Sequence, residues 1–122
     1  MLLLAGCSAQ AHESLQVTIE ANKQSVEVFE PVIITASVEA SGKPVSVDAT
    51  VDFELIHPTG KTIGTVNPEN NGDGTYSIET SFDAAGTYRI ISHVDHGHEH
   101  EMPEVEVTVK WNVAYKLLSS SC

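Results

Sequence analysis

The 122-residue sequence predicts an all-β fold, an antiparallel β-sandwich of about seven strands in one domain. No stretch of useful length repeats its apolar residues with the period of a helix. Instead, short runs rich in Val, Ile and Thr alternate apolar with polar residues, and Gly, Pro, Asn and Asp separate them. Apolar residues make up 41% of the chain, which is enough for one hydrophobic core.

Each expected strand is a short β-branched run that ends in turn residues. The cleanest alternation runs from Ala49 to Leu55, and Asn70-Asn71-Gly72-Asp73-Gly74 predicts a tight turn. The expected strands are 15–19, 32–38, 49–55, 61–66, 75–82, 87–94 and 105–109, with a short edge segment at 26–28 before Glu30-Pro31.

The segment Gly86-Thr87-Tyr88 echoes Gly74-Thr75-Tyr76 and resembles the corner that opens the sixth strand of immunoglobulin-like domains. In such a corner the tyrosine hydroxyl bonds back to the preceding backbone. The Cys…Trp…Cys core of true immunoglobulin domains is absent. The resemblance therefore predicts an immunoglobulin-like antiparallel β-sandwich in architecture only.

The charge balance excludes some partners. There are 17 acidic residues and 6 basic ones, with a net charge of −11. Nucleic acid is not an expected partner, because binding it requires Lys and Arg to neutralise phosphates. Electrostatic docking on anionic lipid is excluded on the same grounds. A strongly negative surface favours attraction of cations.

The start of the chain, Leu4-Ala5-Gly6-Cys7, resembles the lipobox of bacterial lipoproteins. The basic region and much of the apolar stretch of a signal peptide are missing, so we interpret residues 1–6 as a truncated signal remnant. The resemblance implies lipidation of Cys7 and anchoring at the extracytoplasmic face of the cell membrane. Residues 7–13 would then be the lipidated cysteine and its tether, 14–110 the folded domain and 111–122 a tail of uncertain structure.

The segment from His93 to Pro103 is the strongest functional signal. It holds four of the six histidines, at positions 93, 96, 98 and 100, and Met102 follows them. Imidazole suits Cu(II) and Zn(II), and thioether sulfur favours Cu(I), so the mixed set favours copper over zinc. Zinc or nickel stays open, although no thiolate lies nearby to form a structural zinc site. His12 and His57 stand apart, as surface or turn histidines.

A hairpin with His96-Gly97 at its tip would give the cluster its geometry. Pairing His93 with His100 in this register also pairs Arg89 with Glu104, an opposite-charge pair that supports it. His93, His98, His100 and Met102 would then share one exposed face. His96, on the turn, would be a supplementary ligand. The alternative is adventitious binding by a histidine-rich loop.

With these residues in view, the chain resembles the YtkA-like/FixH-like group of small extracytoplasmic domains. The resemblance rests on Gly-Asp-Gly-Thr-Tyr at 72–76, on Ala85-Gly86-Thr87-Tyr88, and on His93 followed by His100, Met102 and Pro103. It implies His93, His100 and Met102 as metal ligands and copper handling as the theme. His96 and His98 are additions in this chain.

Two functions follow as hypotheses. The first is a lipoprotein that binds copper at the hairpin and buffers it or delivers it to a membrane protein. The alternative is an immunoglobulin-like protein-interaction module whose histidines are incidental. An enzyme is not expected, because the sequence holds no Gly-x-Ser-x-Gly motif, no phosphate loop and no Cys–His pair inside the fold.

Overall fold

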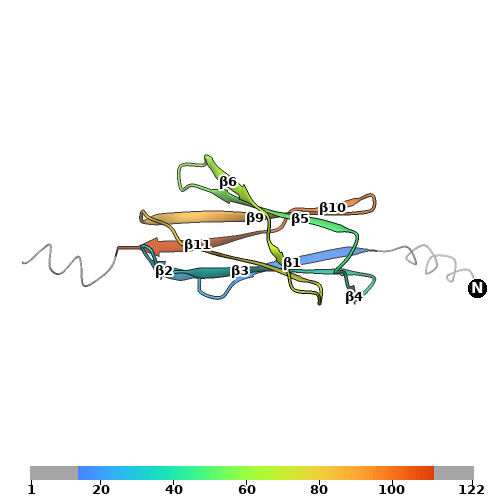
Figure 1. Ribbon diagram of the computed structural model, residues 1–122. Coiled ribbons are helices and arrows are strands. Elements are labelled where there is room, and N and C mark those ends of the chain that lie inside the picture. The colour runs from blue at the N-terminus through green and yellow to red at the C-terminus, as the bar shows by residue number, and fades with distance from the viewer. Residues whose placement is uncertain (1–13, 112–122) are drawn as a thin grey trace, which may run out of the picture.

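In the computed structural model, which describes residues 14–111, the chain forms two β-sheets that pack face to face (Figure 1). The predicted signal remnant, Cys7, the tether and all but the first residue of the tail lie outside the described residues. Among residues 14–111, no helix is long and apolar enough to cross a membrane. The predicted all-β, immunoglobulin-like sandwich is confirmed.

The first sheet is antiparallel and has the order β1-β3-β8-β7, with β4 paired to the last two residues of β3. Its strands are β1 (Leu15–Ala21), β3 (Val32–Ala40), β4 (Lys43–Pro44), β7 (Glu69–Asn70) and β8 (Thr75–Thr80).

The second sheet has the order β2-β11-β9-β5-β6, with β10 paired to the far end of β9. Its strands are β2 (Ser25–Glu27), β5 (Ala49–Ile56), β6 (Thr62–Val66), β9 (Gly86–His96), β10 (Glu99–Glu101) and β11 (Glu104–Lys110). All pairs are antiparallel except β2 with β11, which is parallel.

The core lies between the two sheets and follows the alternation of the sequence. From Val51 to Leu55 in β5 and from Tyr88 to Val94 in β9, every second residue is buried and the residues between them are partly exposed, as a strand with one face on a core requires. Phe53 and Ile90 are fully buried against Ile34 of the opposite sheet. Ser92 is also fully buried, and its hydroxyl has no hydrogen-bond partner among the described residues.

The corner at Tyr88 has the predicted form. The Tyr88 hydroxyl donates a hydrogen bond to the carbonyl oxygen of Ala84 (2.8 Å), and the ring stacks on Phe82 with centroids 4.0 Å apart. Gly86 begins the strand with a positive φ of 146°. This corner fixes where β9 begins and therefore which of its residues face outward.

The seven main expected strands and the edge segment are present, with ends shifted by a few residues. Two short strands, β4 and β7, were not predicted. Each has only two residues, too few for an alternation pattern to be recognised. β10 lies in the second arm of the predicted hairpin.

Gly74 is required by a close approach as well as by its backbone. Its φ is +92°, and a Cβ there would lie 2.6 Å from the Cβ of Pro44. Gly72, in the same turn, has a φ of +86° but open space around it. An alanine at position 72 would therefore suffer backbone strain alone, whereas one at position 74 would suffer the same strain and a clash with Pro44.

We expect Gly72→Ala to lower the free energy of unfolding by about 1 to 2 kcal/mol, the cost of a left-handed residue with a side chain. Gly74→Ala should cost about 1 to 3 kcal/mol more, because the added methyl group must displace Pro44. Urea unfolding of the two variants measures the difference. Equal losses would mean that Pro44 yields without cost.

Candidate metal-binding site

The hairpin between β9 and β10 turns one residue later than predicted. Its turn residues are Gly97 and His98, and the pairing places His100 opposite Asp95 rather than opposite His93. The predicted register was therefore wrong by two residues. A two-residue turn of this kind needs a residue with positive φ, and Gly97 supplies it with a φ of 62°. Gly97 is the first residue of the turn, whereas the prediction made it the second.

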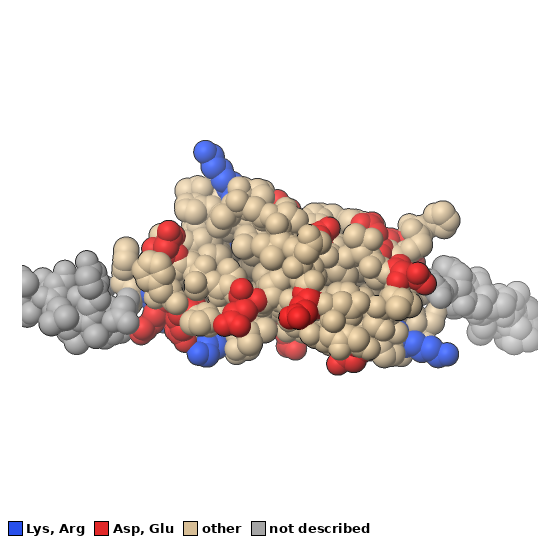
Figure 2. Space-filling model, in the orientation of Figure 1, with Lys and Arg blue, Asp and Glu red and all other residues tan. Residues whose placement is uncertain are grey.

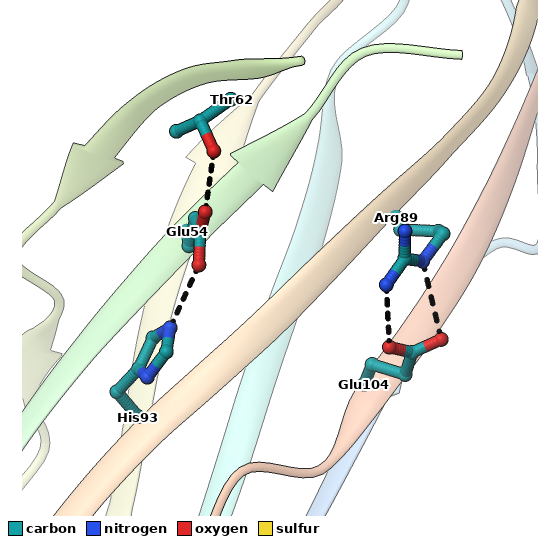
Figure 3. A network of polar contacts seen from close by, with 5 residues as sticks. All are labelled: Glu54, Thr62, Arg89, His93 and Glu104. Atoms are coloured by element: carbon teal, nitrogen blue, oxygen red, sulfur yellow. Dashed lines mark hydrogen bonds and ion pairs between the residues drawn. The ribbon is translucent and has the colours of Figure 1, made fainter. Parts of the chain in front are cut away.

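A shift of two residues keeps the side chains that remain in the strands on their predicted faces, because strand side chains alternate with a period of two. The expected opposite-charge pair between Arg89 and Glu104 still forms, as a diagonal rather than a direct pair. Two guanidinium nitrogens contact the two carboxylate oxygens at 3.0 and 3.3 Å (Figure 3). This bidentate contact lowers the pKa of Glu104 and raises that of Arg89.

His93 and His100 share the outer face of the second sheet, with ring centroids 6.1 Å apart. Metal–nitrogen bonds are about 2 Å long, so two imidazoles on one ion have centroids up to about 6 Å apart. The observed separation lies at the upper end of this range. Because Glu54 holds the His93 ring, the more exposed His100 ring is the one that would turn to bring both nitrogens onto one ion.

His93 is held by a carboxylate from the neighbouring strand. Its Nε2 lies 2.8 Å from Oε1 of Glu54, and the other oxygen of Glu54 accepts a hydrogen bond from the Thr62 hydroxyl (Figure 3). The hydrogen bonds from Thr62 and then from His93 lower the pKa of the Glu54 carboxyl below its usual value. Glu54 is therefore ionised and acts only as an acceptor, so the proton of its contact with His93 belongs to Nε2.

His100 has a similar partner on the strand beside it. Its Nδ1 lies 2.6 Å from Oδ1 of Asp95, its opposite residue in the β9–β10 ladder. A carboxylate can only accept, so Nδ1 donates and Nε2 keeps the lone pair. Each histidine thus has one nitrogen engaged by a carboxylate and one available to a metal.

Met102 lies between β10 and β11 and is half exposed. The ladder keeps one register on both sides of it, with Glu101 opposite Val94 and Glu104 opposite Ile91. Continued through the break, this register places Met102 opposite His93, a position supported by the hydrogen bond from Ser92 N to Pro103 O (2.9 Å). The thioether therefore belongs to the same face as the two imidazoles.

His96 and His98 do not join this group. His98 is exposed and lies in the turn, whereas the predicted hairpin made it the first residue of the second strand. His96 is three residues from His93 on the same strand, so it lies on the opposite face of the sheet. There it lines a pocket of about 280 Å³ with Asp48 and Val47. The predicted convergence of His98 was wrong because His98 belongs to the turn. The predicted position of His96 on the turn was also wrong, because the turn begins one residue later and leaves His96 in β9, opposite Glu99.

Among residues 14–111, no group of three or more His, Cys, Asp or Glu side chains is arranged to hold a metal ion. A three-ligand site on this face would therefore need the methionine sulfur beside His93 and His100. Two imidazoles and a thioether fit copper better than zinc, since the sulfur ligand is soft and uncharged.

Glu54 and Thr62 were missed by the sequence analysis. The alternation from Ala49 to Leu55 does place Asp52 and Glu54 on the polar face of one strand. The missing information is that β5 lies beside β9, which brings Glu54 to His93 across 39 residues of sequence. No local pattern specifies that pairing.

Carboxylates lie beside both histidines of the site, from Asp52 and Glu54 on β5 and from Asp95 on β9. On the face of the molecule drawn in Figure 2, acidic side chains are also widely spread and basic side chains project at a few places. The site lies on the surface of the domain, with His93 and His100 partly exposed. The pocket of about 410 Å³ lies elsewhere, around Phe29, Phe82 and Tyr88.

The fold and this hairpin define a small immunoglobulin-like domain with a histidine pair on the outer face of one sheet. The YtkA-like family profile matches residues 9–93, and the chain belongs to this family. The predicted family is confirmed. The matched region ends at His93, so His100 and Met102 lie beyond it. No curated protein matches the chain.

Solved structures share the fold at low sequence identity. The CARDB domain of the PF1109 protein from Pyrococcus furiosus, in complex with di-metal ions, is 16% identical with a TM-score of 0.55, over 83% of this chain and 96% of that one. The PmoD soluble domain from Methylocystis sp. is 16% identical, with a TM-score of 0.52 over 76% and 90%. A superoxide reductase (neelaredoxin) from Ignicoccus hospitalis is 18% identical, with a TM-score of 0.51 over 84% and 85%.

Proposed function

We propose that this YtkA-like domain binds one copper ion on the outer face of its second sheet, through His93, His100 and Met102. The observation that carries the proposal is the histidine pair itself. The two rings lie 6.1 Å apart, and each gives one nitrogen to a carboxylate. Histidines that bind metals usually donate their second ring N–H to a carboxylate, carbonyl or water, which orients the ring.

Copper is favoured over zinc by the soft sulfur at position 102. Thioether sulfur prefers Cu(I), while imidazole binds both oxidation states and zinc. Neutral imidazole also binds without first losing a proton near pH 7. A site of this composition therefore tolerates the redox change of copper.

Delivery or buffering at a membrane suits the position of the site. His93 and His100 are partly exposed, so a partner protein can exchange ligands with the ion. β10 and the start of β1 lie at the same end of the sandwich (Figure 1), and these strands contact each other. A lipid on Cys7, as the lipobox-like sequence implies, would hold this end toward the extracytoplasmic face of the membrane and a recipient membrane protein.

Replacing Met102 by Ala tests the role of the sulfur. We expect Cu(I) affinity to fall at least about tenfold, and Zn(II) affinity to change much less, because zinc gains little from a thioether. Competition titrations with both ions give the two ratios. Cys7 and Cys122 should be replaced by Ser throughout, since free thiols compete for Cu(I). Equal losses for the two metals would remove the argument for copper.

A second candidate, a protein-interaction module, is favoured by one feature. The pocket of about 410 Å³ around Phe29, Ile63 and Phe82 lies at the β2 end, away from β10, and Phe29 and Ile63 are exposed. In this case a partner identified by cross-linking should bind the His93→Ala/His100→Ala variant as well as the parent protein. Loss of the partner in that variant would count against an incidental role for the histidines.

A further inference from the structure

We propose that Glu54 and Thr62 are positioning residues that make Nδ1 of His93 its metal-binding nitrogen. The inference rests on the proposed copper site and names the device that prepares one of its ligands. It is carried by the hydrogen-bonded series Thr62–Glu54–His93 across three strands, β6, β5 and β9 (Figure 3).

The series fixes both the ring orientation and the tautomer of His93. Both oxygens of Glu54 are acceptors, one for the Thr62 hydroxyl and one for Nε2–H of His93. With the proton on Nε2, the lone pair of the neutral ring is on Nδ1. Among the described residues, Nδ1 of His93 has no hydrogen-bond partner. The ring therefore presents this nitrogen to an incoming ion.

A β-bulge in β6 places Thr62 where it can hold Glu54. The β5–β6 ladder pairs Leu55 with Gly64 and then Ile56 with Thr62, so Ile63 is an extra residue. Such a bulge changes which face the following side chains occupy. Without it, Ile63 would oppose Ile56, and Thr62 would point to the other side of the sheet.

With the bulge, Thr62 shares the outer face with Glu54, because directly opposed residues lie on the same side of a ladder. Its hydroxyl then holds the carboxylate from the side away from His93. The bulge in β6 thus allows Thr62 to donate its hydrogen bond to Glu54. Bulges are frequent beside functional sites.

The Glu54–His93 contact is better shielded than its counterpart on His100. The exposed side-chain fractions are 23% and 30% for Glu54 and His93, against 57% and 44% for Asp95 and His100. Solvent competes more strongly with the second contact. We therefore assign the stronger orienting effect to Glu54.

Asp52 supplies a matched control. It lies on the same strand and face as Glu54 and directly opposite His93, yet its carboxylate accepts a hydrogen bond from Asn67 (2.7 Å). Asp52→Ala and Glu54→Ala each remove one negative charge beside His93. Only Glu54→Ala removes the acceptor of Nε2–H.

The test has two readouts on the intact protein, with Cys7 and Cys122 replaced by Ser. The first is the imidazole ¹⁵N spectrum of the metal-free protein, which assigns the tautomer of His93. We expect Nε2–H to dominate in the parent and in Asp52→Ala, and a mixture in Glu54→Ala. Thr62→Val should fall between them, and far-UV circular dichroism should show all variants folded.

The second readout is Cu(I) affinity by competition. Glu54→Ala should lose about tenfold or more, the usual cost of removing the partner of a metal-binding histidine, and Asp52→Ala at most a few-fold. Unchanged tautomers in Glu54→Ala, or equal affinity losses in the two variants, would overturn the proposal. If the tautomer shifts as expected but the parent binds no copper, the positioning role stands and the copper function fails.

Discussion

Replacing both His93 and His100 by Ala is expected to lower copper affinity by more than about 100-fold, because loss of ligands should exceed the 10–100-fold cost of losing an orienting partner. The two rings are the nitrogen ligands of the proposed site, and among residues 14–111 no third His, Cys, Asp or Glu completes a metal-binding group with them. Competition titration of the parent and the variant, both lacking Cys7 and Cys122, measures the loss.

The same hairpin offers a matched control in His96→Ala/His98→Ala. This variant also removes two imidazoles, but His98 is exposed in the turn and His96 lines a pocket on the other side of the sheet. We expect its affinity to change only a few-fold. Similar losses in the two double variants would indicate a histidine-rich loop that binds metals without a defined site.

Phe53→Ala is expected to lower the free energy of unfolding by about 3 to 5 kcal/mol, the range for removing a buried aromatic side chain. Phe53 is fully buried in the larger core cluster, between β5 and the facing sheet. A small domain has only about 5 to 15 kcal/mol of stability in total, so this variant should unfold at much lower urea concentrations.

Val47→Ala is the appropriate comparison, because Val47 is 71% exposed and its truncation should change stability by less than about 0.5 kcal/mol. Both variants are compared by urea unfolding. A loss below about 1 kcal/mol for Phe53→Ala would mean that the two sheets do not pack around this ring.

The fold could be predicted from the sequence because each long strand carries its own signal. The alternation in residues 49–55 and 87–94 matches the burial that the structure shows, and the Tyr88 corner identifies the beginning of β9. The exact hairpin register could not be predicted. His96-Gly97 and Gly97-His98 both suit a two-residue turn, and the two alternatives leave every side chain outside the turn on the same face.

The candidate site was accessible from the sequence only in part. His93, His100 and Met102 are close in sequence, so the faces they occupy follow from strand parity. Glu54 and Thr62 belong to strands that pair with β9 only in the folded domain, and the contribution of Thr62 depends on a bulge. His96 and His98 were misplaced because the turn lies one residue later than predicted. The shift moves His96 from the turn into β9 and moves His98 from the second strand into the turn.

The most direct test of the copper site is a crystal structure of the copper-loaded protein, with anomalous diffraction at the copper absorption edge. We predict one copper peak per chain, within bonding distance of His93 Nδ1, His100 Nε2 and Met102 Sδ. A peak bound by other residues, or weak copper shared among the hairpin histidines, would contradict the proposed site.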